Sequence, residues 1–237
     1  MCFSAGASFT AGVLLTTIGT ATLKKVHKPA QLAFALIPLF FAFQQFSEGI
    51  LWLTMGRSDF VLVQAVATHV FLILAQVVWP MLVPYSVLLI EKDKTRRKIL
   101  LGLLAGGAVI AFYNLYIFIF HGVHAQIVAN HIAYHTDFII PIGKSAVIFY
   151  LIVTLAPLFV STFKRMSILG VIIAVSFIVS AVFYMQCLTS VWCFFAALIS
   201  FVIYYIIRDA HREYHIDLLA AIKKTVKKTR DKIIKKH

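Results

Sequence analysis

The sequence predicts an all-α protein, a bundle of seven transmembrane helices with its N-terminus outside and its C-terminus in the cytoplasm. The 237-residue chain is 61% hydrophobic and 13% charged, whereas a soluble domain carries about 25% charged residues. Its uncharged runs reach the ~20 residues that cross a ~30 Å hydrocarbon layer. Backbone groups in lipid must be hydrogen-bonded within their own segment, so we expect these runs to be helices.

The runs and the basic residues between them define the predicted topology. The expected spans are residues 5–23, 30–55, 60–90, 99–120, 144–163, 166–186 and 188–207. With this threading, 20 of the 22 Lys and Arg residues fall on one side, and Arg57 and Lys144 fall on the other. Cytoplasmic loops carry the excess of positive charge, so the pattern predicts a multi-pass membrane protein with this side in the cytoplasm.

The span 60–90 has about 31 residues, more than one untilted crossing needs. Trp79-Pro80 and Pro84 would kink it or break it into two helices. Two full crossings would place the basic residues of 92–98 outside, so we predict one long kinked helix.

Residues 1–207 are predicted to form the membrane domain, and residues 208–237 a basic tail. Leu219, Ile222, Val226 and Ile233 repeat at helical spacing among Lys and Arg residues. This pattern is typical of an amphipathic helix on anionic inner-leaflet lipids. The alternative is a solvated tail that only sets topology. The net charge of +13 is distributed as the membrane topology requires, so we expect no nucleic-acid partner. The sequence does not predict the oligomeric state.

Glu48 is the carboxylate that the threading places inside the hydrocarbon layer. Gln44, Gln45 and Trp52 lie four or fewer residues away on the same helix face. An ionisable residue within a membrane is expensive and marks a candidate functional site. We therefore predict an intramembrane polar pocket there, with a hydrogen-bonded structural network as the alternative.

Other residues extend this predicted pocket. His69 lies near the middle of the third span and could approach the face that carries Glu48. Its alternative role is that of a neutral imidazole bonded to a neighbouring helix. Cys2, Trp192 and Cys193 fall near the outer face and would form the mouth of the pocket.

A second candidate site involves metal ligands at the outer face. His131 and His135 would lie one turn apart on a helix, and Cys2 could add a soft ligand, so copper or zinc is a candidate cofactor. A complete site needs further ligands, and we interpret the pair first as part of an interfacial amphipathic helix. Cys2 could instead form a disulfide with Cys187 or Cys193 in an oxidising compartment.

Small and hydroxyl residues form stripes on the first and last spans. Such stripes usually mark close helix packing, and we interpret both as packing faces. The members are Ser8, Gly12, Thr16 and Gly19 in the first span and Ser190, Cys193, Ala197, Ser200 and Tyr204 in the last.

Four motifs carry a resemblance to a known family. They are Met1-Cys2-Phe3-Ser4-Ala5, Gln44-Gln45-Phe46-Ser47-Glu48-Gly49 with Trp52, Trp79-Pro80, and Ser190-Val191-Trp192-Cys193-Phe194-Phe195. The sequence resembles an uncharacterised family of small bacterial integral-membrane proteins over most of its first 200 residues. The resemblance implies a bacterial membrane protein, located in the inner membrane, and it transfers no catalytic role to any residue of this chain.

The leading functional hypothesis is a non-enzymatic membrane protein whose pocket binds a cation, a proton or a small ligand for transport or sensing. The alternative is a membrane-embedded enzyme with an outer-face copper or zinc site. Retinal is excluded because the last span has no Lys to bind it. Haem and the zinc-dependent seven-helix hydrolases are disfavoured, since His69 is the one histidine placed deep in the layer.

Overall fold

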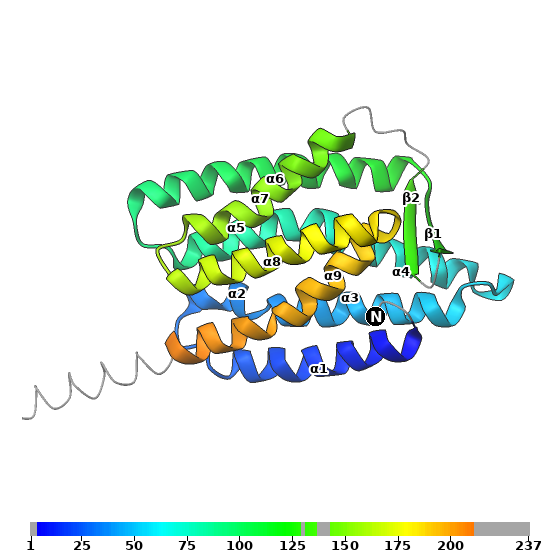
Figure 1. Ribbon diagram of the computed structural model, residues 1–237, viewed down its shortest axis with the longest axis horizontal. Coiled ribbons are helices and arrows are strands. Elements are labelled where there is room, and N and C mark those ends of the chain that lie inside the picture. The colour runs from blue at the N-terminus through cyan, green and yellow to red at the C-terminus, as the bar shows by residue number, and fades with distance from the viewer. Residues whose placement is uncertain (1–3, 129–130, 137–142, 211–237) are drawn as a thin grey trace, which may run out of the picture.

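Long helices run side by side and alternate in direction along one axis of the molecule (Figure 1). The computed structural model describes residues 4–128, 131–136 and 143–210. The main helices are α1 (Ala5–Leu23), α2 (Leu32–Ala35), α3 (Ile37–Thr54), α4 (Val61–Ile73), α5 (Trp79–Ile90), α6 (Lys94–Phe120), α7 (Gly143–Val160), α8 (Lys164–Phe183) and α9 (Leu188–Ile199). Helical structure continues over residues 201–210.

Six helical segments of the described chain are long and apolar enough to cross a membrane. They are Ala5–Leu23, Pro29–Thr54, Ser58–Ile90, Lys94–Phe120, Lys164–Phe183 and Met185–Ala210. A seventh apolar helix, Ser145–Val160, is shorter, and its 16 residues would extend about 24 Å at 1.5 Å per residue. The prediction of a mostly helical chain with several candidate membrane spans is therefore confirmed.

The third segment is a single helical run, as expected, but its irregularity is a π-turn. Five residues, Leu74–Val78, form this turn between α4 and α5. The turn directly precedes Trp79-Pro80, and the helix then continues through Pro84. The run is thus interrupted by a change of hydrogen-bond spacing, which is a recognised cause of helix bending.

The connections gather at two ends of the bundle. One end, called here the basic end, holds the connections α1–α2, α5–α6 and α7–α8 together with the end of the helical run that follows α9 (Figure 1). Its basic residues are Lys24, Lys25, Lys28, Lys92, Lys94, Arg96, Arg97, Lys98, Lys164, Arg165 and Arg208. The opposite end, called the hairpin end, holds the start of α1, the α3–α4 connection with Arg57, and the α8–α9 connection.

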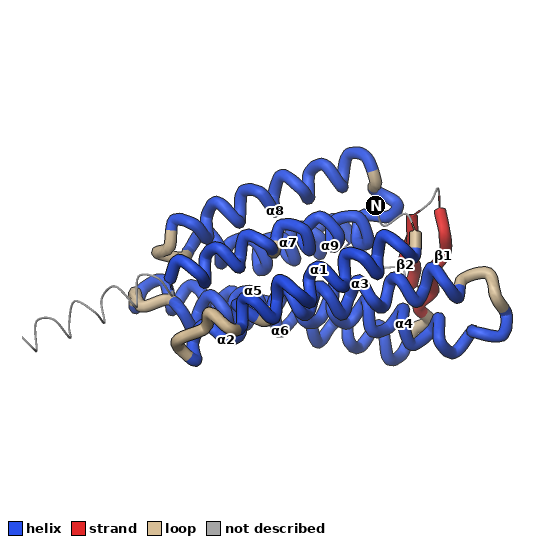
Figure 2. The backbone as a smooth tube through the Cα atoms, turned by 90° about the horizontal axis from the view of Figure 1, so that it is seen from below, coloured by secondary structure: helices blue, strands red, loops and turns tan. Residues whose placement is uncertain are grey.

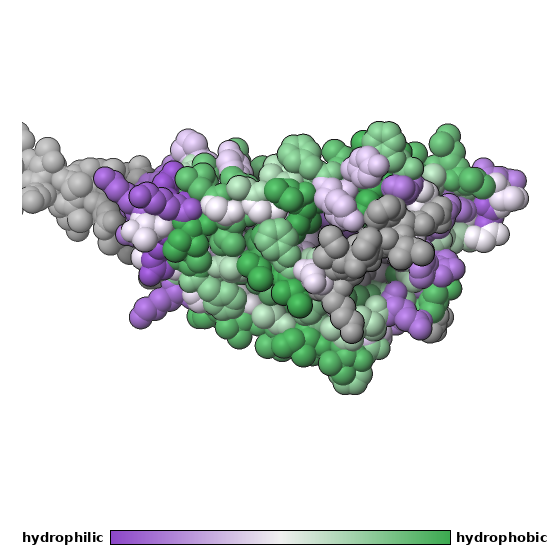
Figure 3. Space-filling model, turned by 90° about the horizontal axis from the view of Figure 1, so that it is seen from above, coloured by the Kyte–Doolittle hydropathy of each residue, from purple (hydrophilic) through white to green (hydrophobic). Residues whose placement is uncertain are grey.

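The surface between the two ends is hydrophobic. Figure 3 shows hydrophilic side chains at both ends and a hydrophobic belt between them. Val13 is 58% exposed, Val109 65% and Val182 69%. Apolar surface on this scale marks an interaction with a membrane or a protein rather than with water.

The hairpin end carries two strands where we expected a helix. β1 (Val123–Val128) and β2 (His131–Thr136) pair antiparallel, with Val123 opposite Thr136 and Val128 opposite His131. Figure 2 shows both strands at the end where α3 is joined to α4. The helix prediction for this loop is wrong because β-branched and aromatic residues at alternate positions favour a half-buried strand over a helix.

Close packing of α1 on α3 fixes the position of the candidate site. A Cβ added to Gly12 would lie 2.8 Å from the Phe46 ring, and one added to Gly49 would lie 3.0 Å from the Phe9 ring. A Cβ on Gly19 would lie 2.5 Å from Leu39. The predicted packing face of the first span is therefore confirmed, and it holds α3 firmly against α1.

Candidate functional site

Helix α3 carries three polar side chains that are completely buried. Gln44, Gln45 and Glu48 are each 0% exposed. The Ser190 hydroxyl of α9, also 0% exposed, donates a hydrogen bond to Oε1 of Glu48. Because a buried carboxyl group is costly without hydrogen bonds, this contact joins α3 to α9 at a defined point.

Gln44 extends the polar contacts to α5. The Trp79 indole Nε1–H donates to Oε1 of Gln44 at 3.1 Å. The Trp79 ring stacks on Phe41, with ring centroids 4.1 Å apart. The Cys193 side chain of α9 contacts the Gln44 side chain. The site, called the Glu48 cluster, consists of Glu48, Gln44, Gln45, Ser190, Trp79 and Cys193.

In the described chain, unsatisfied side-chain amide atoms lie on two neighbouring members of the cluster, Nε2 of Gln44 and both polar atoms of Gln45. Oε1 and Nε2 of Gln45 are buried, and neither has a hydrogen-bond partner within residues 4–128, 131–136 and 143–210. The Ser8 hydroxyl of α1 is also buried and also lacks a hydrogen-bond partner within these ranges. Leaving a buried polar group unsatisfied costs about 1–3 kcal/mol. The arrangement therefore favours a small polar species beside α3.

The structure places two predicted pocket residues elsewhere. His69 is half-buried, and its Nδ1 lies 2.8 Å from the Ala65 carbonyl of its own helix. Trp52 packs in a separate apolar cluster with Leu51, Ala67 and Ile132 below the hairpin. Neither of these contacts joins His69 or Trp52 to Glu48, so their place in the polar pocket stays a prediction.

Two members of the cluster were not predicted as site residues. Ser190 was assigned to a packing stripe, and Trp79 was considered only as part of a proline kink. Both bond to α3 across more than 30 residues of sequence. Local spacing contains no information about such partners, although a polar residue within an apolar span is a usable signal.

The π-turn next to the cluster is held by side chains from α6 and α7. Trp79 N–H bonds to the Leu74 carbonyl, so the Ala75 carbonyl loses its usual donor. Pro80 has no N–H, so the Gln76 carbonyl loses its donor as well. Tyr150 donates to the Ala75 carbonyl at 2.5 Å, and Asn114 donates to the Gln76 carbonyl at 3.0 Å. These two bonds stabilise an irregular backbone in the middle of the bundle.

The geometry of the predicted metal ligands differs from the expectation. His131 and His135 lie four residues apart on a strand, which separates them by about 13 Å rather than one helical turn. Buried His131 packs edge-on against Tyr184, with ring centroids 4.9 Å apart, and exposed His135 contacts Gln126. Burial lowers the pKa of His131 and so favours its neutral form.

No group of three or more His, Cys, Asp or Glu residues suited to a metal ion occurs in the described part of the chain. The predicted ligand Cys2, also a predicted residue of the pocket mouth, lies outside the described residues. Cys187 and Cys193 are buried and form no disulfide within the ranges that the structure describes. A disulfide between Cys2 and Cys187 or Cys193 stays a prediction.

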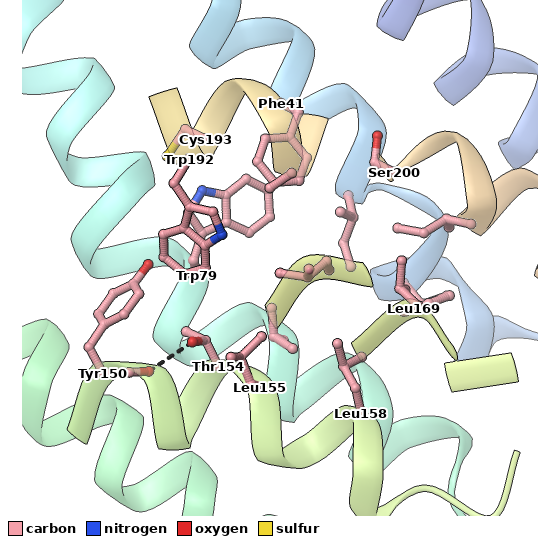
Figure 4. A pocket seen from close by; sticks show the side chains of 16 residues that line it. Phe41, Trp79, Tyr150, Thr154, Leu155, Leu158, Leu169, Trp192, Cys193 and Ser200 are labelled. Atoms are coloured by element: carbon pink, nitrogen blue, oxygen red, sulfur yellow. Dashed lines mark hydrogen bonds between the residues drawn. The ribbon is translucent and has the colours of Figure 1, made fainter. Parts of the chain in front are cut away.

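Two cavities lie beside the Glu48 cluster. The larger, of about 580 Å³, is bounded by α6, α7, α8, α9 and the π-turn. The smaller, of about 70 Å³, is lined by aromatic residues at one end and by Leu155, Leu158 and Leu169 at the other (Figure 4). Trp192 and Cys193, which we had placed at the mouth of the polar pocket, line both cavities.

Apolar helices of spanning length with an exposed hydrophobic belt indicate a multi-pass membrane protein. A family model described as a family of unknown function, DUF6629, matches residues 1–217. The chain belongs to this family, in agreement with the resemblance inferred from its motifs. No curated protein and no solved structure matches the chain.

Proposed function

We propose that the Glu48 cluster binds a proton or a small cation, and that this binding serves transport or sensing across the membrane. The observation that carries the proposal is the buried, unsatisfied amide of Gln45 one helical turn from the carboxyl group of Glu48. A carboxylate supplies charge, and amide and hydroxyl oxygens supply the neutral ligands that hard cations prefer. Ser8 of the neighbouring helix α1 also has a buried hydroxyl without a hydrogen-bond partner in the described part of the chain.

The proposed topology has seven crossings, with the N-terminus outside and the C-terminus in the cytoplasm of an inner membrane. The alternation of direction from α1 to α9 supports it, because α7 runs from the hairpin end to the basic end (Figure 1). The grouping of basic residues at one end supports the sidedness. The tail 208–237, mostly outside the described residues, would then lie against anionic inner-leaflet lipids.

The test uses the full-length protein purified in detergent. A ligand that binds the folded state raises its melting temperature by mass action, so melting should depend on pH or on Na⁺ or K⁺ concentration. Glu48→Gln keeps the size of the side chain and should remove the part of that dependence that comes from this site while the protein still folds. A pH dependence that Glu48→Gln removes identifies the proton as ligand, and a dependence on one metal ion that it removes identifies a cation.

Ser47→Ala is the matched control, because the Ser47 hydroxyl bonds to the Phe43 carbonyl of its own helix at 3.0 Å. This variant should respond as the wild-type protein does. If Glu48→Gln melts with the same dependence on pH, Na⁺ and K⁺ as the wild-type protein, or if it fails to insert into the membrane, the cluster is a structural network and the proposal is wrong.

The alternative of a metal-dependent enzyme has less geometric support in the described residues. Its histidine pair lies on a strand, with one imidazole buried and the other exposed. No observation within the described residues favours it over the Glu48 cluster.

A further inference from the structure

The larger cavity has the size and position of a site for a molecule dissolved in the bilayer. Its volume of about 580 Å³ falls within the range of about 300–1,000 Å³ found for small-molecule sites. Val109 of α6 and Phe149 of α7 line it and are 65% and 42% exposed within the hydrophobic belt. A ligand therefore reaches it from the hydrocarbon layer and need not cross the polar ends.

The wall of this cavity contains a buried hydrogen-bond donor that the described protein does not use. Trp192 Nε1 is buried and has no acceptor among residues 4–128, 131–136 and 143–210. The nearby polar groups of Tyr150 and Asn114 are bonded to the two carbonyls of the π-turn. The donor is thus available to an acceptor on an occupant of the cavity, because an indole N–H is a donor only.

Aromatic rings surround that donor. The Trp192 ring meets Tyr150 edge-on at 6.0 Å and Phe177 edge-on at 5.1 Å between centroids. The smaller cavity shares Tyr150, Trp192 and Cys193 with the larger one and continues to aliphatic side chains. Rings stack or pack edge-on with such a wall, so its chemistry fits a flat ring with apolar substituents.

We propose that this cavity binds a lipophilic ring compound with a carbonyl acceptor, of the class of membrane quinones, and that Trp192 Nε1–H donates to the carbonyl oxygen. Apart from Cys193, which belongs to both, this site differs in its residues and its ligand chemistry from the Glu48 cluster. Cys193 lies between them, since it lines the cavity and contacts Gln44. Binding here is independent of the function proposed for Glu48.

The test is a titration of the purified full-length protein in detergent with decylubiquinone. Binding is measured by isothermal titration calorimetry. Wild-type protein should show saturable binding. Trp192→Phe keeps an aromatic ring but removes the N–H, and should weaken binding about fivefold to tenfold, the effect of one neutral hydrogen bond. Trp52→Phe is the matched control, because its buried Nε1 also has no partner in the described chain while its ring lines neither cavity.

A second pair of variants tests the location without touching the hydrogen bond. Ala146→Phe places a ring in the cavity and should abolish binding, whereas Ile148→Phe, on a 58% exposed position of α7 that lines neither cavity, should not. Glu48→Gln should bind decylubiquinone as wild-type does, which separates this proposal from the proposed function.

Excess phosphatidylglycerol in the titration distinguishes a ring compound from an ordinary acyl lipid. Saturable binding that survives the phospholipid supports the proposal. Displacement by phospholipid, absence of saturable binding to the wild-type protein, or equal affinity of Trp192→Phe and Trp52→Phe overturns it.

Discussion

Replacing Glu91 with Gln should loosen the basic end of the bundle. Glu91 follows α5 and is 3% exposed. Its Oε1 accepts hydrogen bonds from the backbone N–H groups of Lys92 at 2.9 Å and Asp93 at 3.0 Å and from the Thr162 hydroxyl at 2.6 Å. Its Oε2 accepts from the Thr162 N–H at 2.7 Å. One carboxylate therefore joins the α5–α6 connection to the α7–α8 connection.

The magnitude follows from the pKa of this carboxyl group. Burial raises the pKa, but the hydrogen bonds from Thr162, Asp93 and Lys92 outweigh burial and lower it from 4.5 to about 2. At 1.36 kcal/mol per unit, the ionised form stabilises the fold by up to about 3.4 kcal/mol. A lowered pKa means that this stabilisation is complete above pH 4.5 and is lost as the pH falls from 4.5 towards 2.

The assay is thermal unfolding of the detergent-purified protein at pH 7 and at pH 3. Glu91→Gln should lower the free energy of unfolding by about 3 kcal/mol at pH 7, and the difference from wild-type should shrink at pH 3. Asp59→Asn, an exposed acidic position at the hairpin end, is the control and should change little. A difference that is the same at both pH values would refute the reasoning, because it would not come from the charge.

Three further results are expected. Gly107→Ala should destabilise the protein by about 3 kcal/mol, because the added Cβ would overlap the Pro80 carbonyl oxygen. Gly102→Ala is the control and should not destabilise it, because a Cβ there would meet no atom within 4 Å. Denaturation of both variants measures the difference. Tyr150→Phe should cost about 1 kcal/mol by unfolding measurements, because the Ala75 carbonyl of the π-turn loses its donor. In a Cys2→Ser background, cysteines introduced in the α1–α2 and α5–α6 connections should be shielded from an impermeant maleimide in intact cells, whereas one in the α3–α4 connection should react. The reverse pattern would contradict the proposed sidedness.

The helical segments could be predicted because each depends on its own residues. A run of apolar side chains must form a helix in lipid, and basic residues stop at the membrane surface. The same argument identified Glu48, Gln44 and Gln45 as buried polar residues of one helix face. The strands at the hairpin end were missed, because their alternating pattern covers only six residues each.

The partners of these residues could not be predicted from spacing. Ser190 bonds to Glu48 from 142 residues away, and Trp79 bonds to Gln44 from 35 residues away. Which residues of α9 and α5 face α3 depends on helix rotation and crossing geometry, to which every packed side chain contributes. The same holds for Glu91, which looked like one charge in a basic connection.

The sequence by itself determined the class of protein, the approximate limits of its helices and the position of a carboxyl group inside the apolar layer. These properties follow from transfer free energies of single residues and from the period of one helix. The tertiary structure decided that Ser190 and not His69 accompanies Glu48, that Trp192 borders a cavity, and that Glu91 joins two connections. Those contacts arise between elements distant in sequence, where packing brings together side chains that no local pattern relates.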